Sequence, residues 1–156
     1  MYASGLRRHI LLAGAGLLGL STSQAAPVTL PSPASLQEAL ARALEKRSPL
    51  VVLVSLEGCP FCKTARENYL APLQTQQNLP VVQLDMRSRQ VVQNFKGVQT
   101  THDELIRSWG VKIAPTVLFF GRDGQELAER LVGAYIPDFY GSYLDERLKL
   151  ARLTIF

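Results

Sequence analysis

Residues 35–55 have the pattern of a helix followed by a buried strand. Ser35 and Glu38 have the spacing of a capping box, which marks a helix start. Ser48-Pro49 ends the helix. Leu50 to Ser55 is then a continuous apolar run with three valines, which is typical of a central strand buried on both faces. Five apolar residues at helical spacing define the buried face of the helix: Leu36, Ala39, Leu40, Ala43 and Leu44.

The middle of the chain predicts a second helix and a second strand. The helix runs from about Pro60 to Gln76, because proline suits the first helical turn. Pro72 lies inside this stretch and should kink the helix or end its first segment. Val81 to Asp85 has the composition of a strand. Residues 87–100 are polar and irregular, and we interpret them as a loop or small hairpin inserted into the domain.

A further helix and a hairpin are predicted next. Thr101 and Glu104 form a second capping box at the helix start. Val117 to Phe120 is an apolar strand, and the Gly-Arg-Asp-Gly sequence at 121–124 is a strong turn signal. The chain should therefore return along a paired strand from Glu126 to Val132.

A last helix opens at Pro137 and completes the pattern. The whole order predicts an α/β fold in which a mixed central β-sheet is flanked by helices on both faces. Five residues of the last helix are assigned to its inner side: Phe139, Tyr140, Tyr143, Leu144 and Leu148.

The first 25 residues have the pattern of a signal peptide. Arg7 and Arg8 form a positive region, Ile10 to Leu20 is apolar, and small residues precede an expected cut after Ala25. The rival interpretation is an uncleaved anchor, but this apolar stretch is shorter than the roughly 20 residues that span a bilayer. We therefore expect export to the periplasm, with residues 26–34 as a Pro-rich linker.

Charge excludes one class of partner. The formal net charge is +4, and two of the positive charges belong to the signal segment, at Arg7 and Arg8. The net positive charge of the rest of the chain is too small for a nucleic-acid-binding face, which needs clustered basic residues. We expect a single domain that works as a monomer and binds no nucleic acid.

The chain has only two cysteines, Cys59 and Cys62, and they stand directly after the first apolar strand. A strand that ends in Cys-x-x-Cys and feeds a helix makes one thiol acidic, because the helix N-terminus favours a thiolate. Cys59 would cap the helix and attack, and Cys62, one turn inside, would resolve the mixed disulfide.

Two other uses of the cysteines are weaker. A structural disulfide across two residues closes a very small loop and adds little stability. Zinc needs four ligands, and outside the signal segment only His102 could join the two cysteines as a nitrogen ligand. No metal or other cofactor is expected.

The order of elements, the Cys-x-x-Cys turn and the later Pro-Thr before an apolar strand resemble the thioredoxin superfamily over about residues 35–150. The thioredoxin-like domain would then span 35–156, with 87–100 as a small insertion. In that family the matching proline is cis and lies beside the redox pair. The resemblance therefore implies that Ala114 and Pro115 present backbone to a substrate, with Pro60 and Phe61 also in contact.

The signal peptide, the Gly-Cys-Pro-Phe-Cys turn and the insertion at 87–100 make the chain similar, within the superfamily, to exported bacterial thioredoxins of the SoxW-like kind. Three departures from cytoplasmic thioredoxins stand out: Gly58 replaces a tryptophan, and Leu53 and Gln83 replace a buried aspartate and its lysine partner. That aspartate helps to deprotonate the second cysteine in the family. Glu57 could substitute for it in proton transfer, although an acidic residue in a loop can equally be a solvated charge.

These features favour a periplasmic thiol–disulfide oxidoreductase that reduces protein disulfides. The resemblance implies an inner-membrane electron donor of the DsbD kind. An oxidase of the DsbA kind or an isomerase would use the same two cysteines, and a third hypothesis is a thioredoxin-fold binding module without redox turnover.

Overall fold

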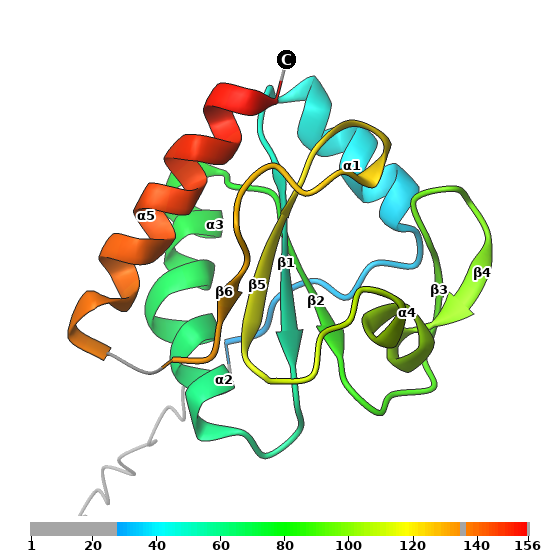
Figure 1. Cartoon of the computed structure of the whole chain (residues 1–156), viewed down its shortest axis with the longest axis horizontal. Coiled ribbons are helices and arrows are strands. Elements are labelled where there is room, and N and C mark those ends of the chain that lie inside the picture. Colours follow the sequence, from blue (N-terminus) through cyan, green and yellow to red (C-terminus); the bar gives the residue numbers. More distant parts are fainter. Residues whose placement is uncertain (1–27, 135–136, 156) are drawn as a thin grey trace, which may run out of the picture.

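A four-stranded mixed sheet forms the centre of the molecule (Figure 1). The computed structural model describes residues 28–134 and 137–155, so the signal peptide expected at 1–25 lies outside the described residues. The strand order is β2-β1-β5-β6. β1 pairs parallel with β2 and antiparallel with β5, and β5 pairs antiparallel with β6. The predicted fold class is confirmed. The strand bounds are β1 Leu50–Ser55, β2 Val81–Asp85, β5 Thr116–Phe120 and β6 Leu131–Val132.

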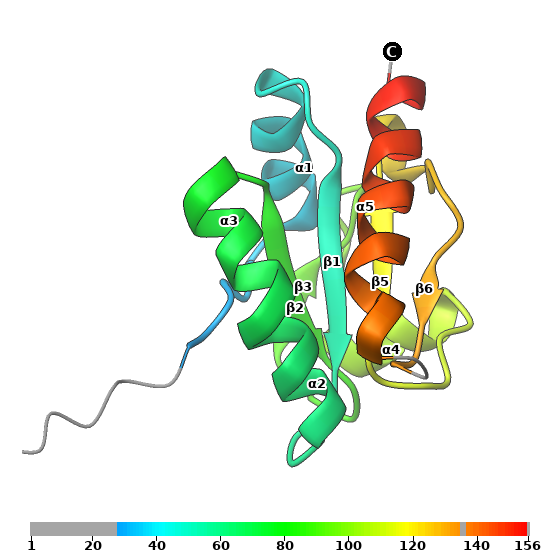
Figure 2. The ribbon, with the colours of Figure 1, turned by 90° about the vertical axis from the view of Figure 1, so that its left-hand side faces the viewer.

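One face of the sheet is covered by α1, α4 and a small hairpin (Figures 1 and 2). Both predicted helix starts are observed: Ser35 caps α1, and Thr101 with Glu104 forms a complete capping box on α4. The expected irregular stretch at 87–100 contains the hairpin, which packs through the buried Val92. The bounds are α1 Leu36–Glu45, β3 Val91–Gln93, β4 Gln99–Thr101 and α4 His102–Ser108.

The other face carries α2, α3 and α5 (Figure 2). α2 (Pro60–Thr64) continues into a π-helical segment, Ala65–Leu70, and then into α3 (Ala71–Gln77). The N–H of Ala71 donates to the carbonyl of Arg66, five residues back, directly before Pro72. Proline has no N–H for an α-helical bond, so a change of hydrogen-bond register beside it keeps the helix continuous.

The predicted strand from Glu126 to Val132 is wrong for most of its length. Within this stretch only its end, β6, pairs with β5 as a strand, apart from a single bridge between Phe120 and Glu126. Leu127 and Ala128 both pack against the apolar cluster on the α5 face. Successive strand residues point to opposite faces, so two neighbours that bury the same way break the strand. The turn at 121–124 does reverse the chain, as predicted.

The inner face of α5 (Pro137–Thr154) is narrower than the sequence suggested. Tyr140, Leu144 and Leu148 are buried as expected, but Phe139 is 57% exposed and Tyr143 is 41% exposed. Each exposed ring precedes a buried residue by one position, which rotates it by about 100° on a helix with 3.6 residues per turn. A helix lying on a sheet buries one stripe, and these two rings fall outside it.

Residues 28–34, the described part of the expected linker, form no helix or strand but lie against the domain. The carbonyl of Pro31 accepts from the N–H of Gln83, and that of Ala34 accepts from the N–H of Gln93. Leu30 is buried in the apolar cluster of the α5 face. Within the described ranges, no helix has the length and apolar character needed to cross a membrane.

Candidate active site

The two cysteines lie at the junction between the end of β1 and the start of α2. Gly58 has a φ of 73°, a conformation that glycine adopts without strain, and this turn places Cys59 at the N-cap of α2. The N–H of Cys62 donates to Cys59 Sγ over 3.2 Å. The two sulfurs form a disulfide, so the structure represents the oxidised pair. When the pair is reduced, the same N–H would stabilise a thiolate on Cys59.

The two sulfurs differ in access to solvent. Cys59 is half-buried at the surface, whereas Cys62 is 1% exposed on the inner side of α2. A substrate can therefore approach Cys59 but not Cys62. This asymmetry fits the roles that the sequence predicts, in which Cys59 attacks and Cys62 resolves.

A cis peptide bond between Ala114 and Pro115 faces the redox pair. Cys59 Sγ lies 4.0 Å from the carbonyl oxygen of Ala114, although the two residues are 55 positions apart. In the disulfide this sulfur has no proton, so the contact is one of proximity. The cis bond is as the family resemblance implies, and the substrate-binding role of Ala114 and Pro115 stays a prediction.

Apolar side chains stand exposed around this junction. Phe61, between the cysteines, is 58% exposed, Ile113 is 45% exposed and Val132 is 36% exposed. Ile113 directly precedes Ala114 in the cis-proline loop, and Val132 pairs with Thr116 directly after that loop. Pro60 is exposed beside Phe61. Exposed apolar groups near a reactive sulfur provide surface for an unfolded or extended substrate chain.

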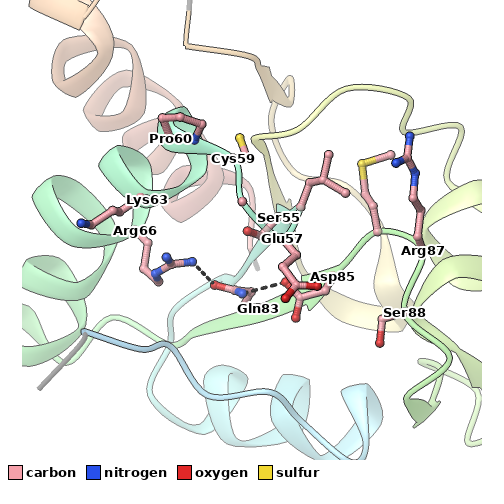
Figure 3. A pocket seen from close by; sticks show the side chains of 13 residues that line it. Ser55, Glu57, Cys59, Pro60, Lys63, Arg66, Gln83, Asp85, Arg87 and Ser88 are labelled. Atoms are coloured by element: carbon pink, nitrogen blue, oxygen red, sulfur yellow. Dashed lines mark hydrogen bonds between the residues drawn. The ribbon is translucent and has the colours of Figure 1, made fainter.

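An open pocket of about 1110 Å³ lies along the β2 side of Cys59 (Figure 3). Its polar wall includes a chain of hydrogen bonds that the sequence did not reveal. Arg66 Nη1 donates to Gln83 Oε1 over 3.1 Å, and Gln83 Nε2 donates to Asp85 Oδ1 over 2.8 Å. Gln83, singled out because it replaces a lysine, thus connects a cation to a carboxylate. Every second residue of β2, namely Val81, Gln83 and Asp85, points to one face of the sheet. This spacing could have indicated from the sequence that Gln83 and Asp85 lie together.

His102 holds Asp85 from the opposite side of the sheet. The imidazole is 0% exposed, and its Nδ1 accepts the backbone N–H of Asp85 over 3.1 Å. Burial lowers the pKa of His102, and the nearby carboxylate of Asp85 opposes that shift only in part. The ring is therefore a neutral acceptor at neutral pH. The sequence alone suggests His102 only as a zinc ligand.

Glu57, the proton-transfer residue that the sequence suggests, lines the same pocket. Its side chain is exposed and forms no hydrogen bond or ion pair with any described residue. Lys63 is also exposed on the pocket wall. Among residues 28–134 and 137–155, no three His, Cys, Asp or Glu side chains gather as a metal site would require.

A mixed sheet, a Cys-x-x-Cys pair at a helix N-terminus and a facing cis-proline define the class of thiol–disulfide oxidoreductases. The sequence also matches the thioredoxin-like domain family over residues 36–147, so the chain belongs to that family. No curated protein shows significant similarity to the chain.

Solved structures share the fold at low sequence identity. Mitochondrial thioredoxin 3 from Saccharomyces cerevisiae, in its oxidised form, is 18% identical with a TM-score of 0.51, over 77% of this chain and 93% of that chain. A DsbH oxidoreductase is 18% identical with a TM-score of 0.53, over 88% of this chain and 96% of that chain. At these identities the likeness concerns the fold alone.

Proposed function

We propose that the chain is a periplasmic reductase of protein disulfides, of the SoxW-like kind. The observation that carries the proposal is the asymmetric redox pair. Cys59 is half-buried and 4.0 Å from the carbonyl oxygen of Ala114 at the cis-proline, while Cys62 is buried behind it. The sequence pattern of a signal peptide at residues 1–25 supports export.

The reaction proceeds by two exchanges of sulfur bonds. The thiolate of Cys59 attacks one sulfur of the substrate disulfide, a mixed disulfide forms, and the other substrate sulfur leaves as a thiolate. The thiolate of Cys62 then attacks Cys59 Sγ, and the second substrate sulfur leaves. Two electrons pass to the substrate, each released thiolate takes up a proton, and Cys59 and Cys62 end in the disulfide that the structure contains.

The substrate chain lies across the cis-proline in this proposal. The backbone of Ala114 and Pro115 positions the substrate segment that carries the attacked sulfur. Phe61 and Pro60 contribute the exposed apolar surface beside Cys59. An extended chain would gain backbone hydrogen bonds there, and the apolar contacts add affinity without demanding one sequence.

A reductase in an oxidising compartment must be reduced again after each turnover. The proposed donor is an inner-membrane electron transporter of the DsbD kind, which would return two electrons to the disulfide of Cys59 and Cys62. The protein would meet this donor and its substrates through the same exposed sulfur, one at a time, as a monomer.

The redox state of the pair in the native host tests this direction. Cells are quenched with acid, free thiols are alkylated with a heavy maleimide, and the protein is detected by its mass shift. A reductase is expected to be mostly reduced, and to become oxidised when the membrane donor is deleted. A pair that is fully oxidised in both strains would instead support an oxidase.

A further inference from the structure

Asp85 is held more firmly than an ordinary acid at a strand end. Its backbone N–H donates to His102 Nδ1 over 3.1 Å, and its carboxylate accepts from Gln83 Nε2 over 2.8 Å. Gln83 is held in turn by Arg66. His102 is wholly buried; its Nδ1 is paired with the N–H of Asp85, and its Nε2 has no hydrogen-bond partner among the described residues. The hydrogen bonds from Arg66 to Gln83 and from Gln83 to Asp85 therefore hold the carboxylate (Figure 3), while His102 holds the backbone of Asp85.

The carboxylate lies on the same face of the sheet as the helix that carries Cys62. β1 and β2 are parallel, with Ser55 opposite Asp85 and Leu53 opposite Gln83. Leu53 belongs to the apolar cluster under the helix segments that follow the cysteines. Partners in adjacent strands point to the same face, so Gln83 and Asp85 face that helix too.

Two further observations relate Gln83 and Asp85 to the sulfurs of the redox pair. Arg66 follows Cys62 by one helical turn and reaches down to Gln83 over 3.1 Å. Cys59 and Asp85 line the same open pocket, and Cys62 Sγ is bonded directly to the sulfur of Cys59. Ser55, Gln83 and Asp85 give the pocket wall the polar partners that an ordered water needs.

We propose that Asp85 accepts the proton of Cys62 in the resolving step, with Gln83 and His102 as its positioning residues. The proton leaves Cys62 Sγ through pocket water and binds the carboxylate of Asp85. The thiolate of Cys62 attacks Cys59 Sγ, the bond from Cys59 to the substrate sulfur breaks, and the leaving thiolate takes its proton from Asp85. This inference rests on the proposed function, and it assigns a role to a residue that the sequence comparison with thioredoxins did not mark.

Four other charged residues line the same pocket as this carboxylate. Glu57 comes from the loop after β1, Lys63 and Arg66 from the helix, and Arg87 from the segment after β2. The neutral ring of His102 lies behind it on α4. Glu57 is the rival acceptor, but its exposed side chain has no partner among the described residues that would hold it in place.

The test separates the two sulfur exchanges in time. Reduced protein is mixed with the aromatic disulfide dithiobis(nitrobenzoate) in a stopped-flow instrument, and the yellow nitrothiobenzoate is recorded. Attack by Cys59 gives a first release whose rate depends on reagent concentration. Attack by Cys62 on the mixed disulfide gives a second release that does not. Each phase is measured across pH for the wild type and for Asp85→Asn.

Asp85→Asn is expected to slow the second release at neutral pH by at least about tenfold, since a positioned base contributes a factor of this order or more. The pH at which the second release reaches half of its maximal rate is expected to be higher in Asp85→Asn than in the wild type. The first release is not slowed, because loss of a negative charge only favours a thiolate on Cys59. If Asp85 acted only through its charge, Asp85→Asn would accelerate both releases. The two explanations therefore predict opposite changes in the rate of the second release.

Three further variants make the result decisive. Glu67→Gln removes one negative charge from the same helix outside the pocket and should leave both releases within about twofold of the wild type, as surface charges have small effects. Gln83→Leu keeps the acid but removes its support, and should slow the second release in the same direction as Asp85→Asn. If Asp85→Asn does not fold, Gln83→Leu provides the test in its place. Glu57→Gln tests the rival acceptor.

An unchanged second release in Asp85→Asn, an equal change in both releases, or slowing confined to Glu57→Gln would overturn the role of Asp85. Failure of the proposed function looks different: the wild type itself would show no second release and would not reduce insulin. A wild type with two releases and an unaltered Asp85→Asn would therefore sink this inference alone.

Discussion

Replacing Cys59 with serine is expected to abolish reduction of insulin disulfides, with a loss of at least about a thousandfold, as removal of a catalytic nucleophile does elsewhere. Of the two cysteines, only Cys59 can be reached by a substrate, because Cys62 is 1% exposed behind it. A serine hydroxyl does not exchange with disulfides at neutral pH. The rate is followed by the turbidity of the released insulin chain with dithiothreitol as donor.

Cys62→Ser is the matched control for this loss, since it removes the other sulfur and keeps the attacking one. Circular dichroism and the urea midpoint of each variant, compared with the reduced wild type, show that the domain is still folded. Residual reduction by Cys59→Ser within tenfold of the wild type would contradict the assignment of the nucleophile.

Replacing Phe119 with alanine is expected to lower the free energy of unfolding by about 3–5 kcal/mol, the usual cost of removing a buried aromatic ring. Phe119 is 0% exposed on β5 and packs into the apolar cluster beneath α5. A loss of this size is a large share of the total stability of a small domain. Urea denaturation followed by circular dichroism measures it.

Phe139→Ala is the control, because it makes the same chemical change on α5 at a ring that is 57% exposed. Its expected cost is below about 1 kcal/mol, as for other exposed substitutions. Equal losses in the two variants would mean that α5 buries a different stripe from the one observed here.

The parts of the fold that local pattern determines were predictable. A continuous apolar run produced β1, and the Ser35 cap and the Thr101–Glu104 capping box produced the starts of α1 and α4. The position of Cys59 after a strand placed it at a helix N-cap. Each depends on residues within a few positions of one another. The family resemblance added the cis bond before Pro115, which no local pattern dictates.

The missed features depend on contacts between distant segments. The network of Arg66, Gln83, Asp85 and His102 joins three elements, and its members are ordinary polar residues when considered one at a time. The strand expected from Glu126 failed because tertiary packing turned two neighbouring side chains the same way. The alternation of polar and apolar residues does not show where tertiary packing outweighs the local preference for a strand.

The wrong assignment of Phe139 and Tyr143 has a simpler origin. Both are large and apolar enough to be placed inside by composition, but helix geometry allows only one stripe to face the sheet. Spacing from Tyr140 through Leu144 to Leu148 identifies that stripe, and hydrophobicity without spacing does not.

Trapping with Cys62→Ser tests the central claim most directly. The reduced variant is incubated with insulin, quenched with acid and analysed by intact mass spectrometry and peptide mapping. The account predicts a stable mixed disulfide between Cys59 and an insulin chain, absent from the wild type, where Cys62 resolves it, and absent from Cys59→Ser. An unmodified Cys62→Ser variant that still reduces insulin, or an adduct that forms without Cys59, would contradict a redox pair in which Cys59 attacks and Cys62 resolves.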